Sequence, residues 1–339
     1  MNSNTSINSP LNNIDSNILN LPKTSAGEIT IITPENKTYT EPMSGYYPAT
    51  YGFENDLVGN NPYEWTVAEQ GLQTVEVISS LDGHNNVLEI FDTESSTEAY
   101  AKAINGFSAQ TSGTVEWSFR RDGFQEYIYM RLWKNFTNIA IVLGSASGNF
   151  QYEYDGSWHV FATCEDNTWY HMRVDFECGT GSYQGLLADT FYVYIDGTRY
   201  GPYSFFASAD DIDSLDLTTR GWGASSDYWG YFDALGYSWD PNYNIGDNLN
   251  EGLLLSYDNT TTLEWQAYSL DGLANKTVLG NKTILMPDLG LHKIQVFGNN
   301  SLGTIYKSSK RYFSITPINL ITPENISYTS AMNGYYPAT

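Results

Sequence analysis

Between residues 52 and 239, hydrophobic and polar residues alternate in many short runs separated by Gly, Asn and Asp. Residues 127–133, Tyr-Ile-Tyr-Met-Arg-Leu-Trp, follow this rule, as do residues 169–176 and 191–195. A period of two places successive side chains on opposite faces of a β-strand. The pair Asp196-Gly197, directly after residue 195, is a strong signal for a tight hairpin turn. The pattern therefore predicts an all-β protein whose middle part forms one large two-sheet sandwich.

Charge and hydropathy exclude two classes of partner. The chain of 339 residues has 39 acidic and 16 basic side chains and a net charge of −23. Because no cluster of Lys or Arg is present to neutralise phosphates, we expect no nucleic-acid partner. No stretch approaches eighteen consecutive apolar residues, so we expect no membrane insertion. The Asn- and Ser-rich segment 1–28 predicts a flexible leader, and the composition favours an extracellular or cell-surface location.

A repeat indicates how the chain is organised. Residues 29–50 return as residues 318–339, with 15 of 22 positions identical at a spacing of 289 residues. This period is too long for one turn of a solenoid and suits a two-domain module. We therefore expect residues 318–339 to start a second repeat unit, with tandem neighbours in the same chain.

Three segments carry a resemblance to a known superfamily. They are residues 169–174 (Trp-Tyr-His-Met-Arg-Val), 194–197 (Tyr-Ile-Asp-Gly) and 231–238 (Tyr-Phe-Asp-Ala-Leu-Gly-Tyr-Ser). In this order they resemble the concanavalin A-like lectin/glucanase superfamily, in its laminin G-like branch. The resemblance covers about residues 50 to 240. It implies a jelly-roll sandwich that binds glycans or proteins, sometimes with Ca²⁺, and that hydrolyses glycans in one branch.

A second resemblance concerns the flanking segments. Residues 265–272, 291–299 and 311–315 are similar to strands in the Ig-like domains of prokaryotic surface proteins. In that family, a first strand like residues 29–40 is followed closely by one like residues 253–257, whereas here some two hundred residues intervene.

The Ig-like resemblance therefore implies a nested arrangement. The jelly roll, residues 45–244, is inserted between the first Ig-like strand at 29–44 and the remainder of that domain at 245–316. The alternative is a linear arrangement in which residues 29–44 are only a linker strand.

Alternation also predicts a binding face. In residues 127–133 it directs Ile128, Met130 and Leu132 into the core and the other four side chains outward. Aromatic rings stack on sugar C–H surfaces, while Arg and His hydrogen-bond to hydroxyls, so outward faces of this kind suit a glycan. If the strands are neighbours they form one platform, but the rings could instead only stabilise the sheet or lie beneath a loop. The predicted platform residues are Tyr127, Tyr129, Arg131, Trp133, His171, Arg173, Tyr192 and Tyr194.

Two further sites are expected. The glycine-rich segment 221–230 predicts a rim loop that adds Trp222, Tyr228 and Trp229 to the platform, unless the loop folds its own rings inward. The jelly-roll resemblance implies a structural Ca²⁺, held by Glu54 near the first strand and Asp233 in the last, if those strands are adjacent.

Catalytic signals are weak. Residues 89–94, Glu-Ile-Phe-Asp-Thr-Glu, depart from the acidic spacing of the resembled glucanases, and no metalloprotease or nucleophile-elbow motif is present. We therefore predict no catalytic residues. We expect a non-enzymatic binding or adhesion protein that recognises a glycan or a cell-surface protein. The alternatives are a structural spacer in a surface array and a glycoside hydrolase of the glucanase branch.

Overall fold

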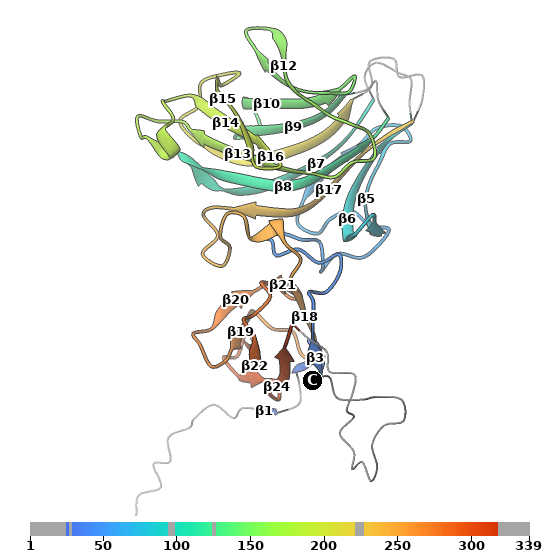
Figure 1. Ribbon diagram of the computed structural model, residues 1–339, viewed down its shortest axis with the longest axis vertical. Helices are drawn as coiled ribbons and strands as arrows, with labels where there is room; N and C mark the ends of the chain where they lie inside the picture. The colour runs from blue at the N-terminus through green and yellow to red at the C-terminus, as the bar shows by residue number, and fades with distance from the viewer. Residues whose placement is uncertain (1–24, 27–28, 94–98, 124–126, 221–226, 318–339) are drawn as a thin grey trace, which may run out of the picture.

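The computed structural model describes residues 25–26, 29–93, 99–123, 127–220 and 227–317, which form two β-sandwiches of unequal size (Figure 1). The all-β fold class is confirmed. Within these ranges the only helices are two single 3₁₀ turns, η1 (Tyr183–Gly185) and η2 (Asp247–Leu249). No helix in the described part of the chain is long and apolar enough to cross a membrane. The predicted second repeat unit, residues 318–339, lies outside the described residues.

The large sandwich is a jelly roll of two seven-stranded sheets. We name them by their position relative to the small sandwich, because one faces it and the other faces away (Figure 1). The distal sheet has the order β12 (Ser157–Thr163), β11 (Asn149–Tyr154), β10 (Asn138–Ala146), β9 (Tyr127–Lys134), β16 (Ile212–Arg220), β7 (Tyr100–Gln110) and β4 (Thr66–Glu69). The proximal sheet has the order β15 (Thr198–Ser204), β14 (Thr190–Ile195), β13 (Tyr170–Glu177), β8 (Ser112–Asp122), β17 (Tyr228–Tyr237), β6 (His84–Asp92) and β5 (Thr74–Leu81).

The core of the large sandwich lies between these sheets. The alternate residues Ile128, Met130 and Leu132 of β9 are at most 2% exposed and belong to this core, as the sequence pattern predicts. In β13 the inward residues are Met172 and Val174, which are fully buried. Truncating one such side chain to Ala costs about 2–5 kcal/mol of stability. The opposite residues of β9 and β13 therefore lie on the two outer faces of the sandwich.

The small sandwich is completed by segments from both sides of the large one. One of its sheets comprises β1 (Ser25–Ala26), β23 (Ile305–Lys307), β22 (Gly290–Asn299), β19 (Trp265–Leu270), β20 (Lys276–Val278), β24 (Arg311–Ile315) and β3 (Thr38–Tyr39). The other comprises β2 (Ile29–Thr33), β18 (Leu253–Asn259) and β21 (Lys282–Ile284). β2 pairs with β18 and β3 pairs with β24, although the large sandwich separates them in sequence. These are the pairings that the nested arrangement requires.

The two segments that join the sandwiches run side by side. Met43 N–H donates to Gly252 O at 2.8 Å, and Gly252 N–H donates to Tyr46 O at 2.8 Å. A further isolated bridge joins Tyr51 to Leu235. The chain therefore enters and leaves the large sandwich at one place, which lets it be inserted without disturbing the small sandwich. The predicted leader is partly structured, since Ser25 and Ala26 form β1 on the edge strand β23.

Candidate functional site

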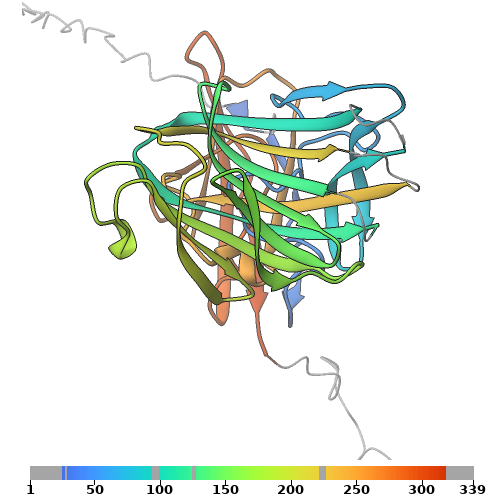
Figure 2. The same cartoon turned by 90° about the horizontal axis from the view of Figure 1, so that it is seen from above.

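A depression of about 420 Å³ lies on the outer face of the distal sheet. Figure 2 views the large sandwich from the side opposite the small one, which is the side of this face. The depression crosses the neighbouring strands β9, β16 and β7 and reaches the residue that follows β4. Its lining residues are Gln70, Tyr100, Lys102, Arg131, Trp133, Thr218 and Arg220. Two of them, Arg131 and Trp133, belong to the predicted platform.

Arg131 is fixed by its partners on the adjacent strand. Its Nη2 donates to Asp216 Oδ2 at 2.6 Å and to Thr218 Oγ1 at 3.1 Å. Asp216 is fully buried and also accepts a hydrogen bond from the Thr218 hydroxyl. The antiparallel register places Arg131 opposite Asp216, so the backbone pairing itself brings the two charges together. The Arg131 side chain retains 14% exposure and contributes to the lining of the depression.

Aromatic rings flank this guanidinium. The Arg131 Cζ lies 5.2 Å from the ring centroid of Tyr129 and 5.3 Å from that of Trp133, within the range of cation–π attraction. Beyond Tyr129, the rings of Tyr127 and Trp158 continue the aromatic surface, with 5.3 Å between their centroids. Trp158 comes from β12 and lies over Gly144 of β10, where an added Cβ would come within 3.1 Å of the indole. The glycine therefore makes room for the ring on this face.

The predicted single platform is wrong in one respect, because its residues lie on two different sheets. Tyr127, Tyr129, Arg131 and Trp133 belong to β9 of the distal sheet, whereas His171, Arg173, Tyr192 and Tyr194 belong to β13 and β14 of the proximal sheet. Each group points outward, as alternation predicts, but the two outer faces are on opposite sides of the sandwich. Alternation determines the face of a strand and says nothing about the sheet to which the strand belongs.

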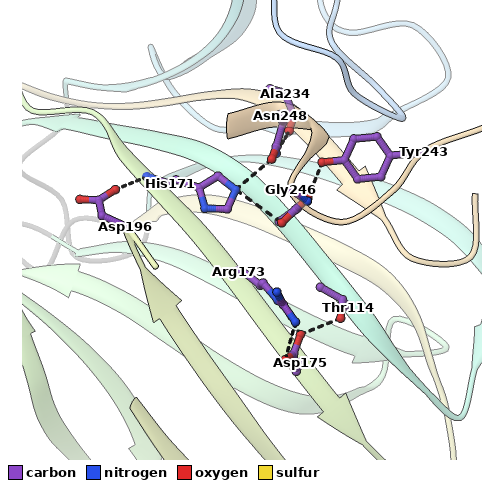
Figure 3. Close-up of polar contacts among 10 residues, drawn as sticks. Thr114, His171, Arg173, Asp175, Asp196, Ala234, Tyr243, Gly246 and Asn248 are labelled. Carbon is purple, nitrogen blue, oxygen red and sulfur yellow. Dashed lines mark hydrogen bonds and ion pairs between the residues drawn. The ribbon is translucent and has the colours of Figure 1, made fainter. Parts of the chain in front are cut away.

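The second group is engaged with other parts of the protein (Figure 3). His171 Nε2 lies 2.9 Å from Asn248 Oδ1 of η2, and Glu116 Oε2 is 3.5 Å from the same nitrogen. Arg173 donates two bonds of 2.8 Å to Asp175 on its own strand. Tyr243 and the backbone N–H of residue 246 donate to Glu116 Oε1. The segment that follows β17 thus covers this part of the proximal sheet.

The two tyrosines of the second group carry cations over their rings. Arg173 Cζ lies 4.6 Å from the ring centroid of Tyr194, and Arg199 Cζ lies 4.6 Å from that of Tyr192. These contacts stabilise the surface of the proximal sheet by cation–π attraction.

The predicted rim loop is also divided by the structure. Tyr228 is not a surface residue: it begins β17, is fully buried in the core and donates from its hydroxyl to Asp92 Oδ2 at 2.9 Å. Trp229 points to the outer face of the proximal sheet, where its ring stacks on Phe91 at 4.9 Å. Trp222 lies outside the described residues. Neither described residue of this loop contributes to the depression.

The predicted calcium ligands have protein partners. Glu54 accepts a hydrogen bond from the Thr283 hydroxyl of β21, while Asp233 Oδ2 lies 2.8 Å from Nδ1 of His84. Burial raises the pKa of Glu54 to about 7 and raises the pKa of Asp233 well above its usual range. Burial also lowers the pKa of His84 to about 4. In the ranges that the structure describes, no group of three acidic, His or Cys side chains is suited to a metal ion, and the Ca²⁺ site stays a prediction.

Five of the lining residues were not singled out from the sequence. They are Gln70, Tyr100, Lys102, Thr218 and Arg220. A local signal exists for the strand residues, since Tyr100 and Lys102 alternate with the buried Ala101 and Ala103. What the sequence lacks is the order of the strands, which places β7 and β16 beside β9.

Comparisons with known proteins are limited to the fold. A scan of the sequence against protein-family models finds no match, and a search of curated proteins finds none either. Among solved structures, the chain is similar to a sialidase, with a TM-score of 0.47 and 14% identity over 58% of this chain and 19% of that chain. It is also similar to the Bacillus licheniformis β-glucanase, with a TM-score of 0.37 and 10% identity over 57% of this chain and 97% of that one.

A galectin from Caenorhabditis elegans gives a TM-score of 0.27 and 11% identity over 44% of this chain and 95% of the galectin. The chain therefore spans about a fifth of the sialidase and nearly all of the two shorter proteins. Similarities of this size carry no argument about function.

Proposed function

We propose that the chain is a non-enzymatic, secreted or cell-surface protein that binds a glycan in the depression of the distal sheet. The observation that supports this most directly is the arrangement around Arg131. A guanidinium held by a buried carboxylate lies between Tyr129 and Trp133, at the floor of a depression of about 420 Å³. Rings of this kind stack on the apolar face of a sugar, while the guanidinium and the Thr218 hydroxyl hydrogen-bond to its oxygens.

The lining favours binding over hydrolysis. A glycosidase of the usual kind needs two carboxyl groups that flank the scissile bond, roughly 5–10 Å apart. None of the described lining residues is acidic. Asp216, the carboxylate bonded to Arg131, is fully buried and already accepts bonds from both neighbours. This supports the proposal of a binding protein without catalytic residues, supported on a small Ig-like sandwich.

The test is a glycan array probed with the wild-type chain, Trp133→Ala and Trp229→Ala. Trp133 lines the depression, whereas Trp229 stacks on Phe91 on the proximal sheet, so the second variant is a matched control for the loss of a partly exposed indole. We expect Trp133→Ala to lose binding by tenfold or more, the size of one lost stacking contact of about 1.5 kcal/mol, and Trp229→Ala to bind normally. Absence of binding by the wild-type chain would favour the structural-spacer alternative.

A further inference from the structure

The depression concentrates positive charge in a strongly acidic protein. The chain has 16 basic residues against 39 acidic ones, yet three basic residues, Lys102, Arg131 and Arg220, line this one depression. They come from three adjacent strands, β7, β9 and β16. On β16, Thr218 lies opposite Lys102 and Arg220 lies opposite Tyr100. The strand register therefore groups the three cations on one face.

These charges are only partly compensated by the protein. Asp216 pairs with Arg131 at 2.6 Å and is fully buried below the depression. Lys102 lies over the ring of Tyr100 at 5.3 Å, and none of the ion pairs formed among the described residues includes it. One carboxylate thus faces three cations, and no lining residue described in the structure is acidic. A net positive surface of this kind attracts an anion over a distance of about 8–10 Å in physiological salt.

The groups with unmet hydrogen-bonding capacity at this site are donors. Nε of Arg131 and Nε1 of Trp133 are both buried without a hydrogen-bond partner. Such donors add to the positive potential of the depression, and they are better matched by ligand oxygens than by ligand N–H groups.

We propose that the ligand is an acidic glycan, with an oxyanion on the sugar, carboxylate or sulfate, held by Lys102 and Arg220 while a neighbouring ring stacks on Trp133. This inference rests on the proposed glycan-binding function and specifies its ligand class. A planar guanidinium and an ammonium group both bind oxyanions, and charge-assisted bonds of this kind are roughly twice as strong as neutral ones. A neutral sugar would leave two cations of the depression without a counter-charge.

The experiment compares ligand pairs that differ only in charge. The wild-type chain is titrated with tetragalacturonate and its methyl ester, and with a sulfated oligosaccharide and its desulfated form. We expect at least tenfold tighter binding of one or both charged members, and the two arms distinguish a carboxylate from a sulfate. Equal binding of charged and neutral members would overturn the inference and leave the proposed function intact. If no glycan on these arms or on the array binds, both fail.

Variants locate the effect on the chain. Lys102→Gln with Arg220→Gln should reduce affinity for the charged probe at least tenfold and leave affinity for its neutral partner unchanged. The matched control is Lys134→Gln, because Lys134 lies on β9 outside the depression and is neutralised by Asp210 at 2.8 Å and Asp211 at 3.2 Å. The charge-retaining pair Lys102→Arg and Arg220→Lys should keep binding, which separates loss of charge from loss of folding. Undiminished affinity of the double Gln variant refutes the inference.

Discussion

The carboxyl group of Glu54 makes the stability of the protein depend on pH in a direction opposite to that of most acidic residues. Glu54 lies where the large sandwich meets β21 and accepts a hydrogen bond from Thr283. Burial is the main cause that raises its pKa from 4.5 to about 7, and the nearby charge of Asp233 adds to the rise. The native state therefore holds a proton on Glu54 between pH 4.5 and 7 that the unfolded state releases. Over that window, the free energy of unfolding falls as pH rises.

The magnitude follows from the shift. One pKa unit corresponds to 1.36 kcal/mol, so a rise from 4.5 to about 7 represents about 3 kcal/mol. Because Glu54 as a residue is only half-buried, solvent screening reduces this to about 2 kcal/mol. Glu54→Gln removes the titration and leaves an amide oxygen for Thr283. We expect the variant to match the wild-type chain at pH 4.5 or below, and to be more stable by about 2 kcal/mol at pH 7.5.

Denaturant unfolding at several pH values between 4.5 and 8 measures this difference. The control is Glu41→Gln, because Glu41 is exposed and its replacement removes the same formal charge. Its stability difference from the wild-type chain should change little with pH. A difference for Glu54→Gln that stays constant from pH 4.5 to 8 would show that the carboxyl group is not desolvated at this contact, and the reasoning would be refuted.

Three further predictions concern packing. Arg121 is fully buried between the sheets and bonds to Asp166 at 3.0 Å; Arg121→Met should lower stability in denaturant unfolding by about 3 kcal/mol, since a buried pair is broken, and an unchanged midpoint would contradict this. Gly144→Leu should displace Trp158 from the distal face and weaken binding on the array with little change in circular dichroism; normal affinity would show that Trp158 is not needed there. Ile31→Asp should destabilise the small sandwich by about 3 kcal/mol or more, because Ile31 is 3% exposed, and calorimetry checks whether the transition of the small sandwich falls while that of the large one is retained.

Local rules predicted the faces of the strands correctly. Ile128, Met130 and Leu132 are in the core and Arg131 is on the outer face, because alternation is a property of each strand alone. The sheet to which a strand belongs is decided by long-range pairing, which leaves no periodic signal. For that reason β9 and β13 were placed on one platform, and Lys102 was not associated with Arg131. Strand order brings them to one depression.

Tyr228 shows a second limit of the sequence. Its neighbours are glycines and polar residues, which predict a loop, yet the residue begins β17 and its ring is buried, with its hydroxyl bonded to Asp92. A buried Tyr needs such a partner, and this one lies 136 positions earlier in the chain. No local pattern contains that information.

The repeat gains meaning from the structure of its first copy. The two copies differ at seven positions, of which Thr30, Lys37, Thr38, Glu41 and Ser44 are exposed in the first copy. Of the remaining two, Pro42 is half-buried, and the buried Ile31 is replaced only by Leu. The second copy therefore keeps the residue types that the small sandwich buries, which supports the prediction that it starts another unit.

The parallel pairing of β3 with β24 determines how the protein responds to tension. Thr38 lies opposite Ser314, and these strands lead to opposite ends of the described chain. Pulling on both ends slides the two strands along each other, so their hydrogen bonds, including Ser314 N–H to Lys37 O at 3.1 Å, are loaded together. Stretching a single molecule should therefore open the small sandwich first. Until it yields, the large sandwich lies outside the load path, and a ligand bound on its distal face is held by an undistorted surface.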